Sequence, residues 1–231
     1  MIVVITGTSR GIGLSLAKRY LNYGYNVIGC SRSESELVHE RYEHFKVDLN
    51  NEDEIDNFAR SVKKKYGHID VLINNAGIAS MNHFMLTPLD TAKRVMSTNF
   101  FATFAMIRSF INALKKSEQP RIINFSTVAV PFNLDGELAY VSSKAAVEAM
   151  TKILAKELAQ FKITVNAVGP TPVKTFLTAK VPEDKIKNLL DRQAIKRFGE
   201  FEDVGNVIDF YIQKTSDFVT GQIIYLGGVN R

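Results

Sequence analysis

Short apolar segments rich in β-branched residues alternate with longer segments of helical periodicity along the chain. The apolar segments predict seven strands, at residues 2–6, 26–31, 44–48, 69–74, 121–126, 163–168 and 222–226. The helical periodicity predicts helices at residues 12–22, 53–66, 89–116, 140–161, 183–192 and 203–214. Strands that alternate with helices indicate an α/β fold of Rossmann type, in which a doubly wound parallel sheet of seven strands has helices on both faces.

The chain is long enough for a full hydrophobic core, since it has 231 residues and 45% of them are hydrophobic. No linker, low-complexity segment or internal repeat interrupts the pattern, which predicts a single domain at residues 1–231. The single cysteine, Cys30, excludes an internal disulfide and favours a reducing compartment. The chain begins with a strand instead of a signal peptide, and its longest apolar stretch, residues 100–107, is too short to span a membrane. We therefore expect a cytoplasmic protein that does not enter the membrane.

The distribution of charge and the spacing of the histidines indicate whether nucleic acid or metal ions are expected as partners. The formal net charge is +5, but the lysines and arginines are scattered and form no basic run interleaved with aromatic residues. We therefore expect no nucleic-acid partner. The four histidines show no metal-ligand spacing with cysteines or carboxylates, so we expect no metal and interpret them as surface or packing residues.

A glycine-rich turn follows the first predicted strand and begins the first predicted helix. In a parallel sheet, ligands bind beyond the carboxyl ends of the strands, where glycines let the backbone approach a pyrophosphate and a helix N-terminus offers free N–H groups. The residues of this turn that we expect to contact a dinucleotide are Gly7, Ser9, Arg10, Gly11, Ile12 and Gly13. The turn alone is weak evidence, because its Gly-x-x-x-Gly-x-Gly spacing differs from the common fingerprint and an ordinary strand-to-helix turn would also contain glycine.

The end of the second predicted strand distinguishes between two dinucleotides. Domains that bind NAD usually carry an acidic residue here for the ribose hydroxyls, whereas this chain has Ser31 and Arg32. These residues, together with Arg10 from the glycine-rich turn, could bind a 2′-phosphate by charge-assisted hydrogen bonds. Taken singly, each arginine could equally be an exposed loop residue. Their joint placement favours NADP(H) over NAD(H).

Tyr140 and Lys144 are the strongest candidates for catalysis. Both lie in an alanine-rich helical segment, where residues four apart share one face. An ammonium beside a phenol lowers the pKa of the phenol from its usual ~10 and favours a general acid that works near neutral pH. A second tyrosine and lysine pair, Tyr42 and Lys46, lies in a predicted strand, where four residues separate the side chains by roughly 13 Å.

Five motifs, spread from one end of the chain to the other, carry a resemblance to a known family. They are Thr6-Gly7-x-x-x-Gly11-x-Gly13, Asn74-Asn75-Ala76-Gly77, Tyr140-x-x-x-Lys144, Asn166-Ala167-Val168-Gly169-Pro170, and Thr220-Gly221-Gln222 followed by Gly227-Gly228. In order and spacing they resemble the short-chain dehydrogenase/reductase family, and above all its members that are similar to 3-oxoacyl-carrier-protein reductases.

The resemblance implies roles for further residues. Along the cofactor it places Asp48 and Leu49 at the adenine, Asn75, Ala76 and Gly77 at the adenine ribose, and Pro170, Val173 and Thr175 at the nicotinamide. Asn99 matches the family's catalytic asparagine, which holds a proton-relay water. The resemblance also implies a homodimer or homotetramer, formed through the helices at residues 89–116 and 140–161 and the last strand.

Three positions depart from the family's pattern. The serine that binds the substrate oxygen is replaced by Thr127, to which we assign the role instead of Ser126, because neighbouring residues on a strand point to opposite faces. Thr171 stands where a glycine usually follows Pro170, which stiffens the loop beneath the nicotinamide. The loop at residues 128–134 is bulkier and more apolar than in relatives. Together these changes predict a narrower and more apolar substrate pocket.

The resemblance predicts an NADP(H)-dependent oxidoreductase that transfers a hydride between nicotinamide and a small-molecule carbonyl or secondary alcohol. Tyr140 is expected to donate the proton and Thr127 to hydrogen-bond the carbonyl oxygen. Lys144 is expected to lower the pKa of Tyr140 and to bind the nicotinamide ribose.

Two alternatives remain open. One is the reduction of 3-oxoacyl groups on a carrier protein, although Glu118 and Phe161 stand where such enzymes often have carrier-binding arginines. The other is a catalytically idle dinucleotide-binding sensor or scaffold, against which the presence of the catalytic residues argues.

Overall fold

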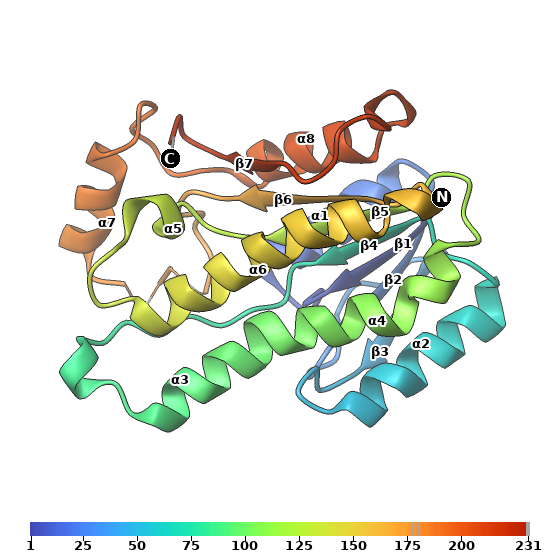
Figure 1. Ribbon diagram of the computed structural model, residues 1–231, viewed down its shortest axis with the longest axis horizontal. Helices are drawn as coiled ribbons and strands as arrows, with labels where there is room; N and C mark the ends of the chain where they lie inside the picture. The colour runs from blue at the N-terminus through green and yellow to red at the C-terminus, as the bar shows by residue number, and fades with distance from the viewer. Residues whose placement is uncertain (177, 180, 230–231) are drawn as a thin grey trace.

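The computed structural model describes residues 1–176, 178–179 and 181–229, and its strands form one sheet in the order β3-β2-β1-β4-β5-β6-β7 (Figure 1). The strands are β1 (Ile2–Thr6), β2 (Asn26–Ser31), β3 (Tyr42–Lys46), β4 (Val71–Asn74), β5 (Arg121–Phe125), β6 (Thr164–Gly169) and β7 (Ile223–Tyr225). Every neighbouring pair is parallel, which confirms the predicted seven-stranded parallel sheet. β1 and β2 have the predicted bounds, whereas β3 begins two residues before the predicted residue 44, because Tyr42 already pairs with Val27 of β2.

Helices connect the strands. They are α1 (Gly11–Asn22), α2 (Glu52–Tyr66), α3 (Leu89–Met96), α4 (Ala102–Leu114), α5 (Ala129–Phe132), α6 (Leu138–Glu157), α7 (Glu183–Asp191) and α8 (Phe201–Ile212). The ends of α2 show how local residues set such bounds. The side chain of Asn51 accepts hydrogen bonds from the N–H groups of Asp53 and Glu54, and Gly67 ends the helix with a φ of 77°.

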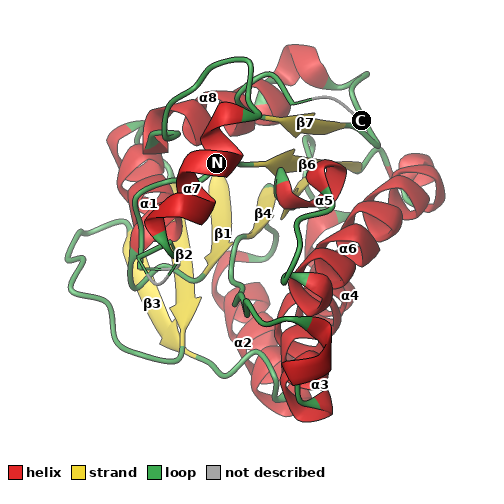
Figure 2. Ribbon diagram, turned by 90° about the vertical axis from the view of Figure 1, so that its left-hand side faces the viewer, coloured by secondary structure: helices red, strands yellow, loops and turns green. Residues whose placement is uncertain are grey.

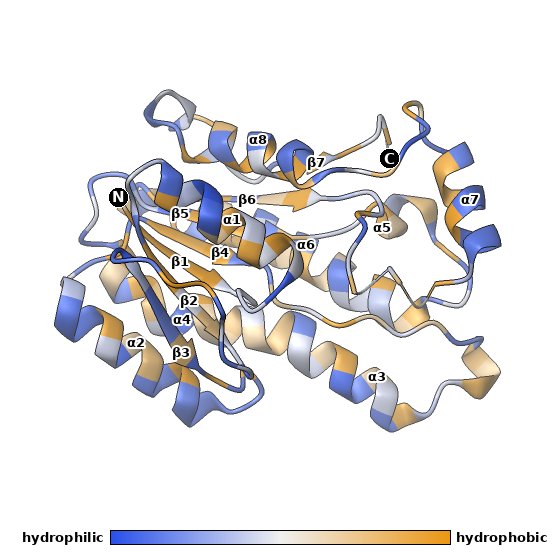
Figure 3. Ribbon diagram, turned by 180° about the vertical axis from the view of Figure 1, so that it is seen from behind, coloured by the Kyte–Doolittle hydropathy of each residue, from blue (hydrophilic) through white to orange (hydrophobic). Residues whose placement is uncertain are grey.

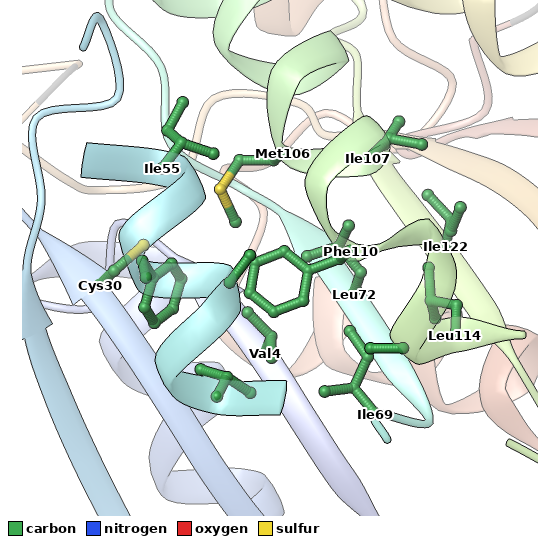
Figure 4. Close-up of a cluster of buried hydrophobic side chains, with 14 of the residues drawn as sticks. Val4, Cys30, Ile55, Ile69, Leu72, Met106, Ile107, Phe110, Leu114 and Ile122 are labelled. Atoms are coloured by element: carbon green, nitrogen blue, oxygen red, sulfur yellow. The ribbon is translucent and has the colours of Figure 1, made fainter. Parts of the chain in front are cut away.

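The helices form two layers, one on each face of the sheet. α2, α4 and α6 cover the face seen in Figure 1, and α1 and α8 cover the face seen in Figure 3. β1 contributes to both cores, because Val4 packs under the first layer while Val3 and Ile5 pack under the second. Figure 4 shows side chains of the first of these cores, among them Val4 of β1, Ile55 of α2 and Phe110 of α4. Each such side chain, when fully buried, stabilises the fold by roughly 1.5–3 kcal/mol.

The long helix predicted at residues 89–116 is divided into three parts. A π-helical segment, η2 (Ser97–Phe101), separates α3 from α4. The segment has five residues, which are too few for the wider period of a π-helix to be told from that of the flanking α-helices, so the sequence pattern does not reveal it. The short helix α5 was also not predicted, since four residues that include Pro131 are too few to show a period.

The carboxyl ends of the strands meet at one end of the molecule, where α5 and α7 lie in front of the sheet (Figure 2). The strand order reverses between β1 and β4, so the loops after these two strands diverge to opposite faces. In the described part of the chain, no helix is long and apolar enough to cross a bilayer.

Candidate active site

A cleft of about 510 Å³ opens at the carboxyl ends of the strands. Its walls come from the turn after β1, the end of β2, the loops after β4, β5 and β6, and α7. Among the described residues that line the cleft are all those predicted along the cofactor except Gly13. Thr127, Tyr140 and Lys144 line it as well, whereas Asn99 lies beneath its surface.

The glycine-rich turn brings the backbone of β1 close to α1. A Cβ on Gly13 would lie 2.2 Å from the carbonyl oxygen of Gly7 and 2.6 Å from Nδ2 of Asn75, so the packing accepts only glycine there. Gly7 and Gly11 have φ values of +77° and +61°, which other residues rarely adopt. α1 begins without a side-chain cap at Arg10 and without an acidic residue in its first turn. Its first N–H groups and its positive dipole end therefore suit a pyrophosphate.

Two guanidinium groups lie at the end of the cleft formed by β2. Arg10 and Arg32 are exposed and line the cleft, and within the described residues neither forms an ion pair. Arg10 also lies over the ring of Phe176, 4.4 Å from its centroid. The hydroxyl of Ser31 is less available than predicted, because it donates to the carbonyl oxygen of Ser33 at 2.6 Å. Of the three residues predicted at this end, the two arginines therefore have the more available donors.

His44 does not line the cleft, but it contacts Ser31 and Ser33, which do. Its Nδ1 lies 2.9 Å from the hydroxyl of Tyr42 and 3.3 Å from that of Thr8. Its Nε2 lies 3.2 Å from the hydroxyl of Ser31 and 3.0 Å from the carbonyl oxygen of Ser33. These contacts position the backbone next to Arg32. The spacing of His44 in the sequence gave no sign of them, because its partners come from three separate segments.

The turn after β4 is joined directly to the end of β1. Nδ2 of Asn75 donates to the carbonyl oxygen of Thr6 at 2.8 Å, and the N–H of Ala76 donates to the hydroxyl of Thr6 at 2.9 Å. On the other side of the cleft, the N–H of Asp48 donates to the carboxylate of Glu54 at 2.8 Å. Both predicted adenosine-binding segments are thus held in place by hydrogen bonds to their neighbours.

Tyr140 and Lys144 lie on the first two turns of α6, as predicted. Lys144 is 5% exposed, and its Nζ donates to the carbonyl oxygen of Phe125 at 2.9 Å. Burial lowers the pKa of Lys144 to about 8. Burial also raises the pKa of Tyr140 to about 12, although a hydrogen bond with Thr127 acts in the opposite direction. The predicted lowering of the pKa of Tyr140 is therefore not met, because the loss of water around the phenolate dominates.

Ser126 and Thr127 follow β5 and have different partners. The hydroxyl of Ser126 donates to a carboxylate oxygen of Glu148, which is 1% exposed and also accepts from the hydroxyl of Tyr225 at 2.6 Å. Thr127 instead shares a hydrogen bond with Tyr140. The hydroxyl beside the tyrosine is thus that of Thr127, while Ser126 belongs to a buried polar cluster that the sequence did not reveal.

Asn99 lies in the π-helical segment η2 and is fully buried. Its Nδ2 donates to the carbonyl oxygen of Ile78 and to the hydroxyl of Ser143, each at 2.9 Å, and its Oδ1 accepts from the N–H of Ile78 at 2.8 Å. A Cβ on Gly77 would lie 3.1 Å from Oδ1 of Asn99 and 3.4 Å from Nζ of Lys144. The asparagine side chain therefore joins the turn after β4 to α6, close to the lysine.

The substrate end of the cleft has both apolar and charged walls. The loop at residues 128–134 is apolar, as predicted, and α5 forms within it. Four charged residues line the same end of the cleft, namely Asp135, Glu137, Lys185 and Arg192. The apolar loop thus shares the cleft with charged groups, and the prediction of a pocket narrower and more apolar than in relatives stays a prediction.

Two hydrogen bonds tie the segment around α7 to the rest of this wall. Thr171, predicted to stiffen the loop after β6, is buried and bonded through its hydroxyl to the side chain of Gln193. The guanidinium of Arg192 donates to the carbonyl oxygen of Phe132 at 2.9 Å and lies 4.3 Å from the centroid of its ring.

Glu137 is a member of the site that the sequence analysis missed. Burial raises the pKa of Glu137 to about 7, and its negative charge raises the pKa of Tyr140. Its position three residues before the tyrosine was visible in the sequence. Its burial was not, because that depends on which loops pack around it.

Comparison with known proteins identifies the family. The family model described as short chain dehydrogenase matches residues 1–186. The chain is 33% identical over 235 residues to a 3-oxoacyl-acyl-carrier-protein reductase of Staphylococcus epidermidis, which covers 97% of this chain and 96% of the relative. The chain is also 33% identical over 236 residues to the 3-oxoacyl-acyl-carrier-protein reductase of Thermotoga maritima, and the alignment covers 98% of this chain and 96% of the relative. The chain therefore belongs to the short-chain dehydrogenase family of oxidoreductases, which implies a nicotinamide dinucleotide cofactor.

A solved structure shows the same fold. The ligand-free aldohexose dehydrogenase of Thermoplasma acidophilum matches with a TM-score of 0.89 and 28% sequence identity, over 99% of this chain and 93% of that chain.

Proposed function

We propose that the protein is an NADP(H)-dependent oxidoreductase that reduces the carbonyl group of a small molecule or oxidises the corresponding secondary alcohol. The observation that carries this proposal is that Tyr140, Thr127 and Lys144 share one cleft with the glycine-rich turn after β1. A hydride donor held along that turn would meet a substrate carbonyl beside the phenol.

The cofactor, when bound, supplies the hydride. Gly7, Gly11 and the start of α1 accommodate its pyrophosphate without a side chain in the way. Arg10 and Arg32 attract the 2′-phosphate, and no acidic residue at the end of β2 repels it. These residues support NADP(H) over NAD(H).

Tyr140 supplies the proton in the direction of reduction. Because its pKa is about 12, the phenol is protonated at neutral pH and holds the proton that the reduced oxygen must receive. Thr127 provides a second hydroxyl to that oxygen. Lys144, whose pKa is about 8, keeps its charge at neutral pH and stabilises the phenolate that remains after the transfer. Asn99 acts by positioning the turn after β4 against α6.

The reduction of 3-oxoacyl groups on a carrier protein is a second candidate. Identity of 33% to carrier-protein reductases over nearly the whole chain favours it. Two residues stand at the positions expected for carrier docking, Glu118 and Phe161. Glu118 is an exposed carboxylate, which does not suit an acidic carrier. Nζ of Lys115 lies 3.5 Å from the ring centroid of Phe161 and places a cation at this surface.

The likeness to an aldohexose dehydrogenase favours polyhydroxylated substrates instead.

One experiment distinguishes these candidates. NADPH oxidation is followed with simple ketones, sugar ketones and 3-oxoacyl thioesters, and the Tyr140→Phe variant serves as the control. We expect turnover of at least one class, reduced by at least ~10²-fold in the variant while NADPH still binds. Binding of NADPH without turnover of any class would favour an idle sensor. Near-normal turnover by the variant would refute the role of the tyrosine.

We also propose that the protein is a homodimer or homotetramer. Large apolar side chains are exposed on the two long helices predicted to form the interface, with Phe101 59%, Phe104 48% and Ile153 55% exposed. Side chains of this size are favourable at the centre of an interface and costly in water. The cytoplasm is the proposed location, since the lone thiol of Cys30 suits a reducing compartment.

A further inference from the structure

Glu137 is the last residue before α6, and it lines the substrate end of the cleft. Its backbone is fully used, because its N–H donates to the carbonyl oxygen of Leu134 at 3.3 Å and its carbonyl accepts from the N–H of Val141 at 2.8 Å. Its side chain does not cap the helix, and among the described residues it forms neither a hydrogen bond nor an ion pair. The fold therefore does not account for this carboxyl group.

The surroundings of Glu137 suggest contact with a ligand. Its carboxyl group has lost much of its water, since burial raises its pKa to about 7. A desolvated ionisable group that lines a cleft without a protein partner is a candidate binding group. Residues three apart at the start of a helix are neighbours, and the charge of Glu137 acts on Tyr140. A ligand group bound by Glu137 would thus lie next to the carbon that receives the hydride.

Other charged side chains at this end of the cleft indicate which ligand group suits Glu137. Lys185 of α7 and Arg192 line the cleft as well, and Asp135 is exposed to water at its rim. A cationic substrate group would face the two cations. A hydroxyl group is a neutral donor, and the carboxyl group can accept from it in either protonation state.

We propose that Glu137 is a specificity residue that accepts a hydrogen bond from a hydroxyl group on the carbon next to the reacting carbonyl. The inference rests on the proposed carbonyl reduction and names its substrate class, hydroxyketones, with vicinal diols in the reverse direction. A ketone without that hydroxyl leaves the carboxyl group desolvated and unpaired, so the site discriminates against it.

The test compares hydroxyacetone with acetone, which differ by one hydroxyl group, as substrates for NADPH oxidation by the full chain. We expect kcat/KM of the unaltered protein to favour hydroxyacetone. Glu137→Leu should reduce that preference by about 10- to 100-fold, as expected for a lost hydrogen bond to a charged group, because kcat/KM falls much more for hydroxyacetone than for acetone. Glu118→Gln, which removes an exposed carboxylate that does not line the cleft, should keep the preference.

The outcomes separate this inference from the function on which it rests. An unchanged preference in Glu137→Leu overturns the inference and leaves carbonyl reduction intact. No NADPH oxidation with any carbonyl compound overturns both. If Glu137→Leu does not fold or does not bind NADPH, the preference for hydroxyacetone over acetone is measured in Glu137→Gln at several pH values. The amide of glutamine does not ionise, so the preference of this variant should not change between about pH 6 and 8. In the unaltered protein the preference rises over that range as the carboxyl group ionises, and the same rise in Glu137→Gln would also overturn the inference.

Discussion

Replacing Glu137 by glutamine should stabilise the protein, with the largest gain at neutral pH and above. The ordinary pKa of this carboxyl group is 4.5, and burial raises it to about 7. Each unit of difference corresponds to 1.36 kcal/mol, so ionising Glu137 in the folded protein costs at most about 3 kcal/mol. Glutamine has nearly the same shape and cannot ionise, so it removes this cost.

The direction of the pH dependence follows from proton binding. Between pH 4.5 and about 7 the folded protein holds a proton on Glu137 that the unfolded chain has lost. The favourable contribution of the protonated group is complete below pH 4.5 and is lost as the pH rises through 7. The variant should therefore gain little at pH 5, and its advantage should grow by roughly 2–3 kcal/mol towards pH 8.

Urea unfolding at fixed protein concentration measures this difference, since an oligomer gains stability with concentration. The free energy of unfolding is compared between Glu137→Gln and the unaltered protein at several pH values. Glu118→Gln, at an exposed position, controls for the loss of one negative charge. A difference for Glu137→Gln that does not change with pH, or that becomes smaller above pH 7, would show that the folded protein does not disfavour the ionised carboxyl group.

Three further predictions concern the site and the assembly. Ser126→Ala should leave turnover nearly unchanged but destabilise the protein by about 1–3 kcal/mol, because buried Glu148 loses a hydrogen-bond donor. Thr127→Ala should instead lower turnover. Steady-state kinetics and urea unfolding measure the two effects, and the opposite pattern would assign the substrate-binding hydroxyl to Ser126. Arg32→Asp should weaken NADPH binding far more than NADH binding in a fluorescence titration, and equal losses would argue against the 2′-phosphate site. Sedimentation should show a dimer or tetramer that Phe101→Glu weakens, and a 25.9 kDa species alone at micromolar concentration would contradict the proposed assembly.

The sequence alone determined the order and type of the main elements. Strand and helix periods are properties of neighbouring residues, so the bounds of β1 and β2 could be read directly from the chain. The same holds for the glycine-rich turn and for Tyr140 and Lys144, whose spacing on a helix places them on one face. Ser126 and Thr127 were told apart by assuming that a strand continues through them, whereas in the structure both follow β5, and their different partners decide the assignment.

Only the tertiary structure decided how strongly each side chain is desolvated and with which distant residue it pairs. The pKa of Tyr140 is set mainly by its burial under segments that are distant in the chain, and not by the charge of the lysine four residues away. The carboxyl group of Glu137 is withdrawn from water by the walls of the cleft, and Asn99 finds its partners on the turn after β4 and on α6. Such energies arise from contacts between segments far apart in the chain, so no local pattern of residues can specify them.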